Sequence, residues 1–123
     1  MGLSTHVLDT MHGCPAAAME VALYTLSEGS TKHNPLATLV TAFRLNQDGR
    51  YAAGPLYDNA SLKKGRYRLV FNVADYFSAK GVTLPEPPFL GYVSLDFGVA
   101  HPDQHYHVPL LVSPWSYSTY RGS

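Results

Sequence analysis

The sequence of 123 residues contains little cysteine and little charge. Its one cysteine, Cys14, has no partner within the chain, so an internal disulfide is excluded and a reducing compartment is the natural setting. Only 15% of the residues are charged and 46% are hydrophobic, whereas a disordered protein needs high charge and low hydrophobicity. Nine Lys and Arg balance nine Asp and Glu, which argues against a nucleic-acid partner, because such proteins need a basic face.

Segments that would direct the chain to or across a membrane are also missing. No hydrophobic run reaches the roughly 18 residues of a membrane span. No Lys or Arg precedes Lys32, whereas a secretory signal begins with positive charge and a mitochondrial presequence is rich in arginine. We therefore expect a soluble, cytoplasmic protein of one domain, residues 1–123, without a membrane partner. The mature form of a secreted chain remains the alternative.

Aromatic residues and turn-forming residues are abundant. Nine Tyr, five Phe, ten Gly and nine Pro are typical of a β protein with many turns. Short runs between the Gly and Pro positions alternate between apolar and polar residues, which is the pattern of half-buried strands. Strands are predicted at 66–73, 92–99 and 105–112, where the alternation is clearest, and at 3–10, 19–26, 38–44, 50–54 and 115–121.

One short helix is expected at 74–80. Asn72 or Asp75 can cap its first turn, and Gly81 follows its last residue, where a glycine commonly ends a helix. About eight short strands with one helix predict an all-β fold, a β-sandwich.

Two of the predicted strands carry histidine on the face that points away from the core. The apolar face of 105–112 consists of Tyr106, Val108, Leu110 and Val112. His105 and His107 alternate with these residues and therefore lie on the opposite face. In 3–10 the same alternation places His6 on the outer face with Ser4 and Leu8.

Six histidines are many for a chain of this length. Histidine changes its charge near neutral pH and is the commonest general acid and base in enzymes. His101, His105 and His107 lie close together, and a pair at i and i+2 on one strand face can also share a metal ion. From spacing alone, three interpretations stay open: exposed histidines without a role, a metal site, and a catalytic site.

The remaining candidate residues are ambiguous when each is taken alone. Arg50 directly follows an Asp-Gly turn and is by itself a solvated charge on an edge strand. His6 and Tyr120 are by themselves a surface histidine and a half-buried tyrosine near a chain end. Cys14 has no nearby base in the sequence, which argues against a cysteine nucleophile. The residue pattern therefore predicts a β-sandwich with a histidine-bearing outer face, and no particular reaction.

Three parts of the chain match a known pattern. They are Ser4–Thr10 with Gly13–Ala16, Asp48–Arg50, and His105–Thr119, which leads into the final tetrapeptide Tyr120–Ser123. These segments resemble the transthyretin superfamily, and the likeness covers nearly the whole chain. The tetrapeptide Tyr-Arg-Gly-Ser resembles the signature of the enzymatic branch, the 5-hydroxyisourate hydrolases.

The resemblance implies an eight-stranded transthyretin-like β-sandwich with one short helix after the fifth strand, in agreement with the helix expected at 74–80. Members of the superfamily pair through sheet edges, and two such dimers pack face to face as a homotetramer. The outer faces that carry His6 and His107 would line the channel between the dimers.

The resemblance also implies a reaction, the hydrolysis of 5-hydroxyisourate at a ring acyl C–N bond, without cofactor or metal. The product is 2-oxo-4-hydroxy-4-carboxy-5-ureidoimidazoline, in the degradation of urate. The family's catalytic residues match His6, Arg50, His107 and Ser123, and its substrate-binding residues match His6, Arg50 and Tyr120. Neutral His6 or His107 would take a proton from water, and Arg50 would stabilise the oxyanion. The sequence does not assign the base.

Two other functions compete with hydrolysis. The transthyretins that carry thyroid hormone use the same channel, but they have Lys at the position of His6, Glu at Arg50, and Thr at both His107 and Tyr120. All four positions here have the residue types of the enzyme, which favours the hydrolase. A zinc-binding structural protein built on the histidine cluster at 101–107 is the third hypothesis.

Overall fold

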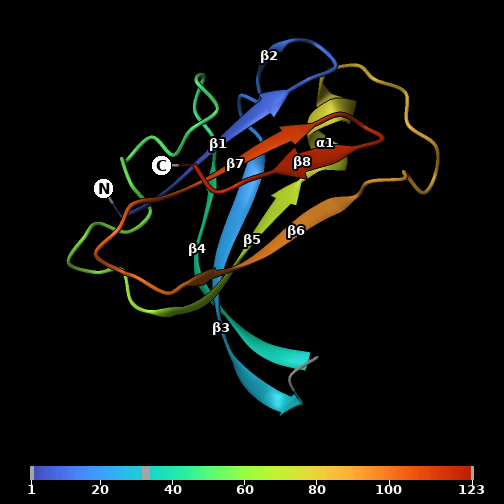
Figure 1. Cartoon of the computed structure of the whole chain (residues 1–123). Helices are drawn as coiled ribbons and strands as arrows, with labels where there is room; N and C mark the ends of the chain where they lie inside the picture. The colour runs from blue at the N-terminus through green and yellow to red at the C-terminus, as the bar shows by residue number, and fades with distance from the viewer. Residues whose placement is uncertain (1, 32–33, 123) are drawn as a thin grey trace.

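The computed structural model describes residues 2–31 and 34–122, and it arranges them as two packed four-stranded sheets (Figure 1). One sheet has the strand order β2-β1-β7-β8 and the other the order β4-β3-β5-β6. The elements are β1 (Leu3–Asp9), β2 (Cys14–Pro15), β3 (Glu20–Thr31), β4 (Asn34–Arg44), β5 (Gly65–Asn72), α1 (Val73–Ala79), β6 (Tyr92–Val99), β7 (Tyr106–Val112) and β8 (Tyr117–Thr119). The all-β sandwich with one short helix is thus confirmed for the described residues.

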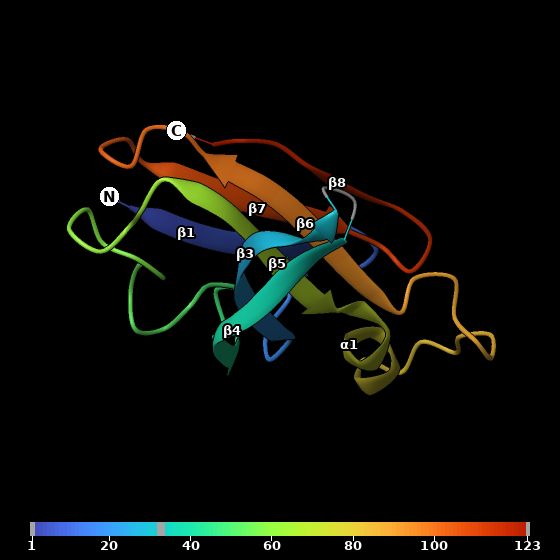
Figure 2. The same ribbon diagram turned by 90° about the horizontal axis from the view of Figure 1, so that it is seen from below.

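The β2-β1-β7-β8 sheet positions the histidines. Figure 2 shows β1 and β7 side by side in one layer of the sandwich. These two strands run parallel, with Ser4 opposite His107 and His6 opposite Pro109. Residues 3, 5, 7 and 9 of β1 are buried and the residues between them are half-buried, so the predicted alternation is confirmed. Ser4, His6 and His107 consequently share the outer face of the sheet.

The core lies between the inner faces of the two sheets. Val7, Leu69, Phe71, Phe77 and Leu110 are fully buried there. Each such side chain contributes about 1.5–3 kcal/mol to folding through its removal from water. The apolar face predicted for 105–112 is therefore part of the core, as expected.

The short helix α1 closes one end of the sandwich (Figure 2). Asn72 caps it, because its side chain accepts a hydrogen bond from the Asp75 backbone N–H. Gly81, at φ +86°, follows the end of the helix in the left-handed region that favours glycine. The predicted helix and both of its end signals are confirmed within one residue. It is far too short to span a membrane, and no other helix in the described part of the chain could do so.

Asp9, the last residue of β1, is a buried carboxylate with three hydrogen-bond donors. It accepts from the backbone N–H of His12 at 2.9 Å, from Nδ1 of His12 at 2.6 Å, and from the hydroxyl of Tyr76 at 2.8 Å. Burial acts to raise the pKa of Asp9, but the hydrogen bonds from His12 and Tyr76 outweigh it, and the pKa lies below its ordinary value. This cluster ties the turn after β1 to the helix.

Two sequence-based strand predictions need correction. Residues 50–54 do not form a strand: Arg50 makes only an isolated β-bridge, the chain turns at residues 52–53, and Gly54, at φ +105°, and Pro55 interrupt any further ladder. The structure also contains a strand that the sequence did not predict, β2, which pairs with β1. Its two residues are too few to show a recognisable alternation. In addition, β3 and β4 are longer than predicted. They continue to pair with each other beyond the core. Their length is therefore set by backbone pairing, which the alternation of buried and exposed residues does not indicate.

Candidate active site

His6 and His107 come from neighbouring strands and lie diagonally across the outer face of the β1–β7 pair. Both side chains are half-buried. The strand register places His107 opposite Ser4, two residues before His6. The Ser4 hydroxyl lies 2.8 Å from Nδ1 of His107. Parallel pairing therefore gathers residues that are about a hundred positions apart in the sequence.

Arg50 is brought to His6 by a tight turn. The Asn46 side chain accepts hydrogen bonds from the backbone N–H groups of Asp48 and Arg50, and Arg50 forms an isolated β-bridge with His6. Gly49, at φ +73°, has no room for a side chain, since a Cβ would lie 2.6 Å from the carbonyl oxygen of Val7. The turn thus fits against the edge of β1 only with glycine at this position.

The electrostatics of the site favour neutral imidazoles. Burial lowers the pKa of His6, and the positive charge of Arg50 lowers it further; hydrogen bonding to the Asp48 backbone acts in the opposite direction. Burial also lowers the pKa of His107, followed by the charges of Arg50, His105 and His6. Both histidines therefore remain uncharged, and able to act as bases, over a wider range of pH than an exposed histidine.

The chain after β8 returns to His107. Gly122 donates its backbone N–H to the carbonyl of His107 at 2.7 Å and accepts from the N–H of His107 at 3.3 Å. A Cβ on Gly122 would lie 2.9 Å from Cδ2 of His107, which requires a shift of one of the two residues. The close approach of the tail to the imidazole thus depends on glycine.

Arg121 anchors this tail. Its guanidinium donates to the carbonyl of His105 at 3.0 Å and to the side chain of Gln104 at 3.1 Å, and it lies 4.0 Å from the ring centre of Tyr106. A cation over an aromatic ring adds to the hydrogen bonds. Tyr120 is 62% exposed and lines a cavity of about 460 Å³ between the open edges of β6 and β8. Ser123 lies outside the described residues.

The structure thus brings together three of the sequence-predicted site residues, His6, Arg50 and His107, on one face. Tyr120 follows β8 at the edge of the same sheet. Sequence reasoning gave no role to Ser4, Arg121 or Gly122, although each contacts the site or its tail. The alternation placed Ser4 beside His6 on the outer face, but only the register of β1 and β7 shows that it reaches His107.

The zinc hypothesis has no ligand set in this structure. Between residues 2 and 31 and between 34 and 122, no three His, Cys, Asp or Glu side chains are placed to share a metal ion. The rings of His105 and His107 stack with centres 6.3 Å apart. A nitrogen of each lies near the Ser4 hydroxyl, while the His101 backbone N–H donates to Tyr106.

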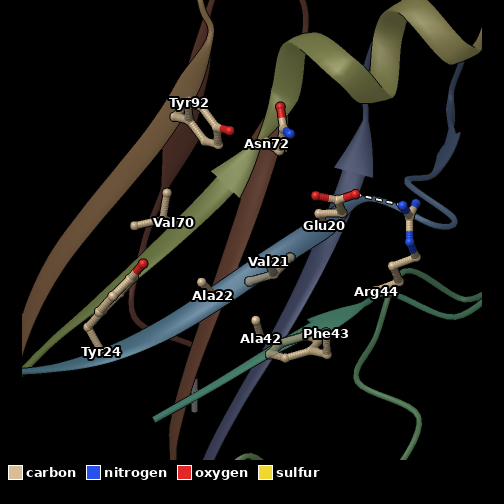
Figure 3. Close-up of a pocket in the computed structure, with 10 residues that line it drawn as sticks. All are labelled: Glu20, Val21, Ala22, Tyr24, Ala42, Phe43, Arg44, Val70, Asn72 and Tyr92. Carbon is tan, nitrogen blue, oxygen red and sulfur yellow. Dashed lines mark hydrogen bonds and ion pairs between the residues drawn. The ribbon is translucent and has the colours of Figure 1, made fainter. Parts of the chain in front are cut away.

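Another pocket lies on the outer face of the β4-β3-β5-β6 sheet (Figure 3). Its volume is about 360 Å³, and apolar side chains such as Ala22 and Val70 line much of it. Its charged residues, Glu20 and Arg44, are joined by an ion pair of 2.6 Å and neutralise each other. None of the predicted site residues lines it, and it offers no histidine or thiol for catalysis. We therefore place the candidate site on the opposite sheet.

Comparison with known proteins agrees with this geometry. Residues 3–122 match the HIUase/Transthyretin family. The chain belongs to this family. A protein from Rhizobium meliloti named 5-hydroxyisourate hydrolase 2 is 51% identical over 121 residues, which are 98% of this chain and 95% of that protein.

Solved structures with a similar fold include proteins of different function. An (S)-allantoin synthase superposes with a TM-score of 0.88 at 47% identity over 99% of this chain, which spans 43% of that longer protein. The 5-hydroxyisourate hydrolase of Klebsiella pneumoniae gives a TM-score of 0.74 at 30% identity, covering 99% of this chain and 98% of that one. Sea bream transthyretin in complex with thyroxine gives 0.78 at 26% identity, covering 99% and 95%. The fold therefore does not separate hydrolases from carriers within the family.

Proposed function

We propose that the protein is an enzyme that hydrolyses 5-hydroxyisourate at a ring acyl C–N bond and yields 2-oxo-4-hydroxy-4-carboxy-5-ureidoimidazoline. The observation that carries the proposal is the gathering of His6, Arg50 and His107 on one half-buried face. An imidazole can act as the base and a guanidinium can stabilise the oxyanion when water attacks a ring carbonyl. Relatives about 50% identical over nearly the full length bear the name of this enzyme, which favours it over a hormone carrier.

The three side chains have complementary tasks in this reaction. One neutral histidine takes a proton from water as the water oxygen forms a bond to the ring carbonyl carbon. Arg50 donates hydrogen bonds to the oxyanion that forms, and its fixed fork of donors suits a planar substrate. The base, now protonated, gives this proton to the ring nitrogen as the C–N bond breaks, while the N–H of the other histidine orients the reacting groups through a hydrogen bond. The proton count balances, because the proton that leaves water ends on the ring nitrogen and the base returns to its neutral form.

The C-terminal tail completes the site in this proposal. Ser123 follows directly on Gly122, whose backbone pairs with His107. We assign to Ser123 the orienting of the attacking water and to Tyr120 the binding of substrate. No acyl-enzyme intermediate is needed, since water attacks the carbonyl directly, and no cofactor or metal is required for any of these steps.

We further propose a homotetramer, a dimer of dimers, with the active site in the channel between the dimers. Leu8 and Leu111 lie half-buried on the outer face of the β1–β7 pair, and they would be covered by a second copy. The edges of β6 and β8 are open, with Tyr92 68% and Tyr117 45% exposed in the single chain. Edge pairing would remove the exposed backbone groups of these strands. The small-molecule substrate and the balance of nine Lys and Arg against nine Asp and Glu fit a cytoplasmic enzyme.

The test generates 5-hydroxyisourate in situ from urate with a urate oxidase and follows the decay of its ultraviolet band. Addition of the protein should accelerate this decay well above the spontaneous rate. The matched control is Arg44→Ala, which removes an exposed arginine on the opposite sheet and should leave the acceleration intact. Decay at the spontaneous rate with folded wild-type protein would contradict the proposed function.

A further inference from the structure

The hydroxyl of Ser4 lies between two histidines of β7. Its oxygen is 2.8 Å from Nδ1 of His107 and 3.4 Å from Nε2 of His105. The other nitrogen of His105, Nδ1, is buried and has no hydrogen-bond partner in the described part of the chain. The three side chains thus form a short chain of polar groups that ends in a buried, unpaired nitrogen.

A neutral histidine carries its proton on one nitrogen only, so this chain has two possible directions. In the first, His105 Nε2–H donates to Ser4, and the Ser4 O–H donates to Nδ1 of His107. His107 then holds its proton on Nε2. In the second, His107 Nδ1–H donates to Ser4 and the Ser4 O–H donates to His105. His105 must then hold its own proton on the buried Nδ1.

Two observations favour the first direction. The second would leave an N–H at the buried Nδ1 of His105 without an acceptor, and unpaired buried N–H groups are rarer than unpaired acceptors. Hydroxyl donors also form shorter hydrogen bonds than N–H donors do. The 2.8 Å contact therefore suits the Ser4 O–H as donor to His107, whereas 3.4 Å is too long for a good O–H bond to His105.

The geometry points to Ser4 and His105 as positioning residues that hold the proton of His107 on Nε2, so that His107 presents this N–H to the substrate as a hydrogen-bond donor and His6 is the base. This inference rests on the proposed hydrolysis and deepens it by assigning the two histidine roles. His6 fits the role of base. It is the other imidazole on this face, and Arg50 bridges to it from the turn at 46–50.

Nitrogen NMR of protein labelled with ¹⁵N-histidine tests the inference directly, because the two nitrogens of an imidazole differ strongly between the two tautomers. The signals of His107 are assigned by their loss in His107→Gln. At neutral pH we expect His107 to be mainly in the Nε2–H form, and Ser4→Ala to shift it toward a mixture of the two forms. A wild-type His107 with its proton on Nδ1 would overturn the inference.

Kinetics provide the second arm. Ser4→Ala should lower kcat roughly tenfold or more with little change in KM, the scale seen when a partner that orients a functional histidine is removed. Ser4→Thr keeps the hydroxyl and should restore the rate. Thr10→Val is the matched control, since it removes a hydroxyl that bonds β7 at Val112, outside the site, and should leave the rate unchanged.

The outcomes separate the two levels of the proposal. Wild-type protein without hydrolase activity refutes the proposed function itself. Active wild-type protein, with tautomer and kcat unchanged in Ser4→Ala, refutes the positioning role and leaves the function standing. Thermal unfolding of Ser4→Ala and Thr10→Val shows whether a lost rate reflects unfolding. If Ser4→Ala is less stable, Ser4→Thr must restore the rate of the folded protein, because it restores the hydroxyl, even where the melting temperature stays low.

Discussion

His107→Ala and Leu110→Ala form a matched pair, because both residues lie on β7 but point to opposite faces of its sheet. Leu110 is fully buried in the core, and His107 is half-buried on the outer face. A fully buried Leu→Ala change costs about 2–5 kcal/mol, since apolar contacts are lost and a cavity remains. His107→Ala removes one partly buried hydrogen bond, to Ser4, which contributes about 0.5–1.5 kcal/mol.

These free energies translate into separate melting temperatures. The entropy of unfolding is about 2 cal/mol/K per residue, so a chain of this length changes its Tm by roughly 4 °C for each kcal/mol. Leu110→Ala should therefore lower Tm by about 8–20 °C, and His107→Ala by about 2–6 °C. Turnover should show the reverse order, with a loss on the order of 10²-fold for His107→Ala.

Circular dichroism melts at one fixed protein concentration provide the first measurement, because the Tm of an oligomer depends on concentration. Decay of enzymatically generated 5-hydroxyisourate, per folded protein, provides the second. Near-normal turnover in His107→Ala would refute its role in the reaction. A collapse of stability in His107→Ala with a small effect in Leu110→Ala would refute the assignment of faces.

The rate of hydrolysis should fall only below the ordinary histidine range of about pH 6.5, because the pKa values of His6 and His107 are lowered and both stay neutral to more acidic pH; a rate that is flat from pH 8 to pH 5 would contradict histidine catalysis. Asp9→Ala should lower the free energy of unfolding by about 3–5 kcal/mol in urea titrations, because donors of three hydrogen bonds lose their buried acceptor. Because the folded pKa of Asp9 is lowered, its contribution is full above its unfolded pKa of about 3.9 and is lost as pH falls through the folded value, so the difference in stability between wild type and Asp9→Asn should narrow progressively as pH falls below about 4. Gly122→Ala should reduce turnover about tenfold or more while leaving the urea midpoint nearly unchanged, since its Cβ would displace the tail from His107; unchanged turnover would show that the close approach is not needed.

Local patterns predicted much of the fold, because the relevant forces act over a few residues. Alternation identified the face of β7 that enters the core, and Asn72 and Gly81 marked the ends of α1. The prediction missed strand β2 and placed a strand at 50–54 where none forms. Both depend on backbone pairing with distant parts of the chain, which local periodicity does not report.

The site was only partly predictable for the same reason. Spacing placed His6 and His107 on outer faces, but it held no signal that Arg50 returns to the edge of β1; that expectation came from family resemblance. The contact of Ser4 with His107 depends on the register of two parallel strands, which no local pattern specifies. The roles of Tyr120 and Ser123 stay predictions.

The core and the candidate site lie on opposite faces of β1 and β7, so the same fold can occur in a 5-hydroxyisourate hydrolase and in a transthyretin that binds thyroxine. The outer-face side chains of β1 and β7 can be exchanged at small cost, because the core does not depend on them. Gly49 and Gly122 are different, since each lets backbone approach a strand that bears a site histidine. The site therefore depends on backbone conformation at the turn and the tail as well as on side chains. A chain with the same core but with larger residues at these two positions would keep the sandwich and lose the approach of Arg50 to His6 and of the tail to His107.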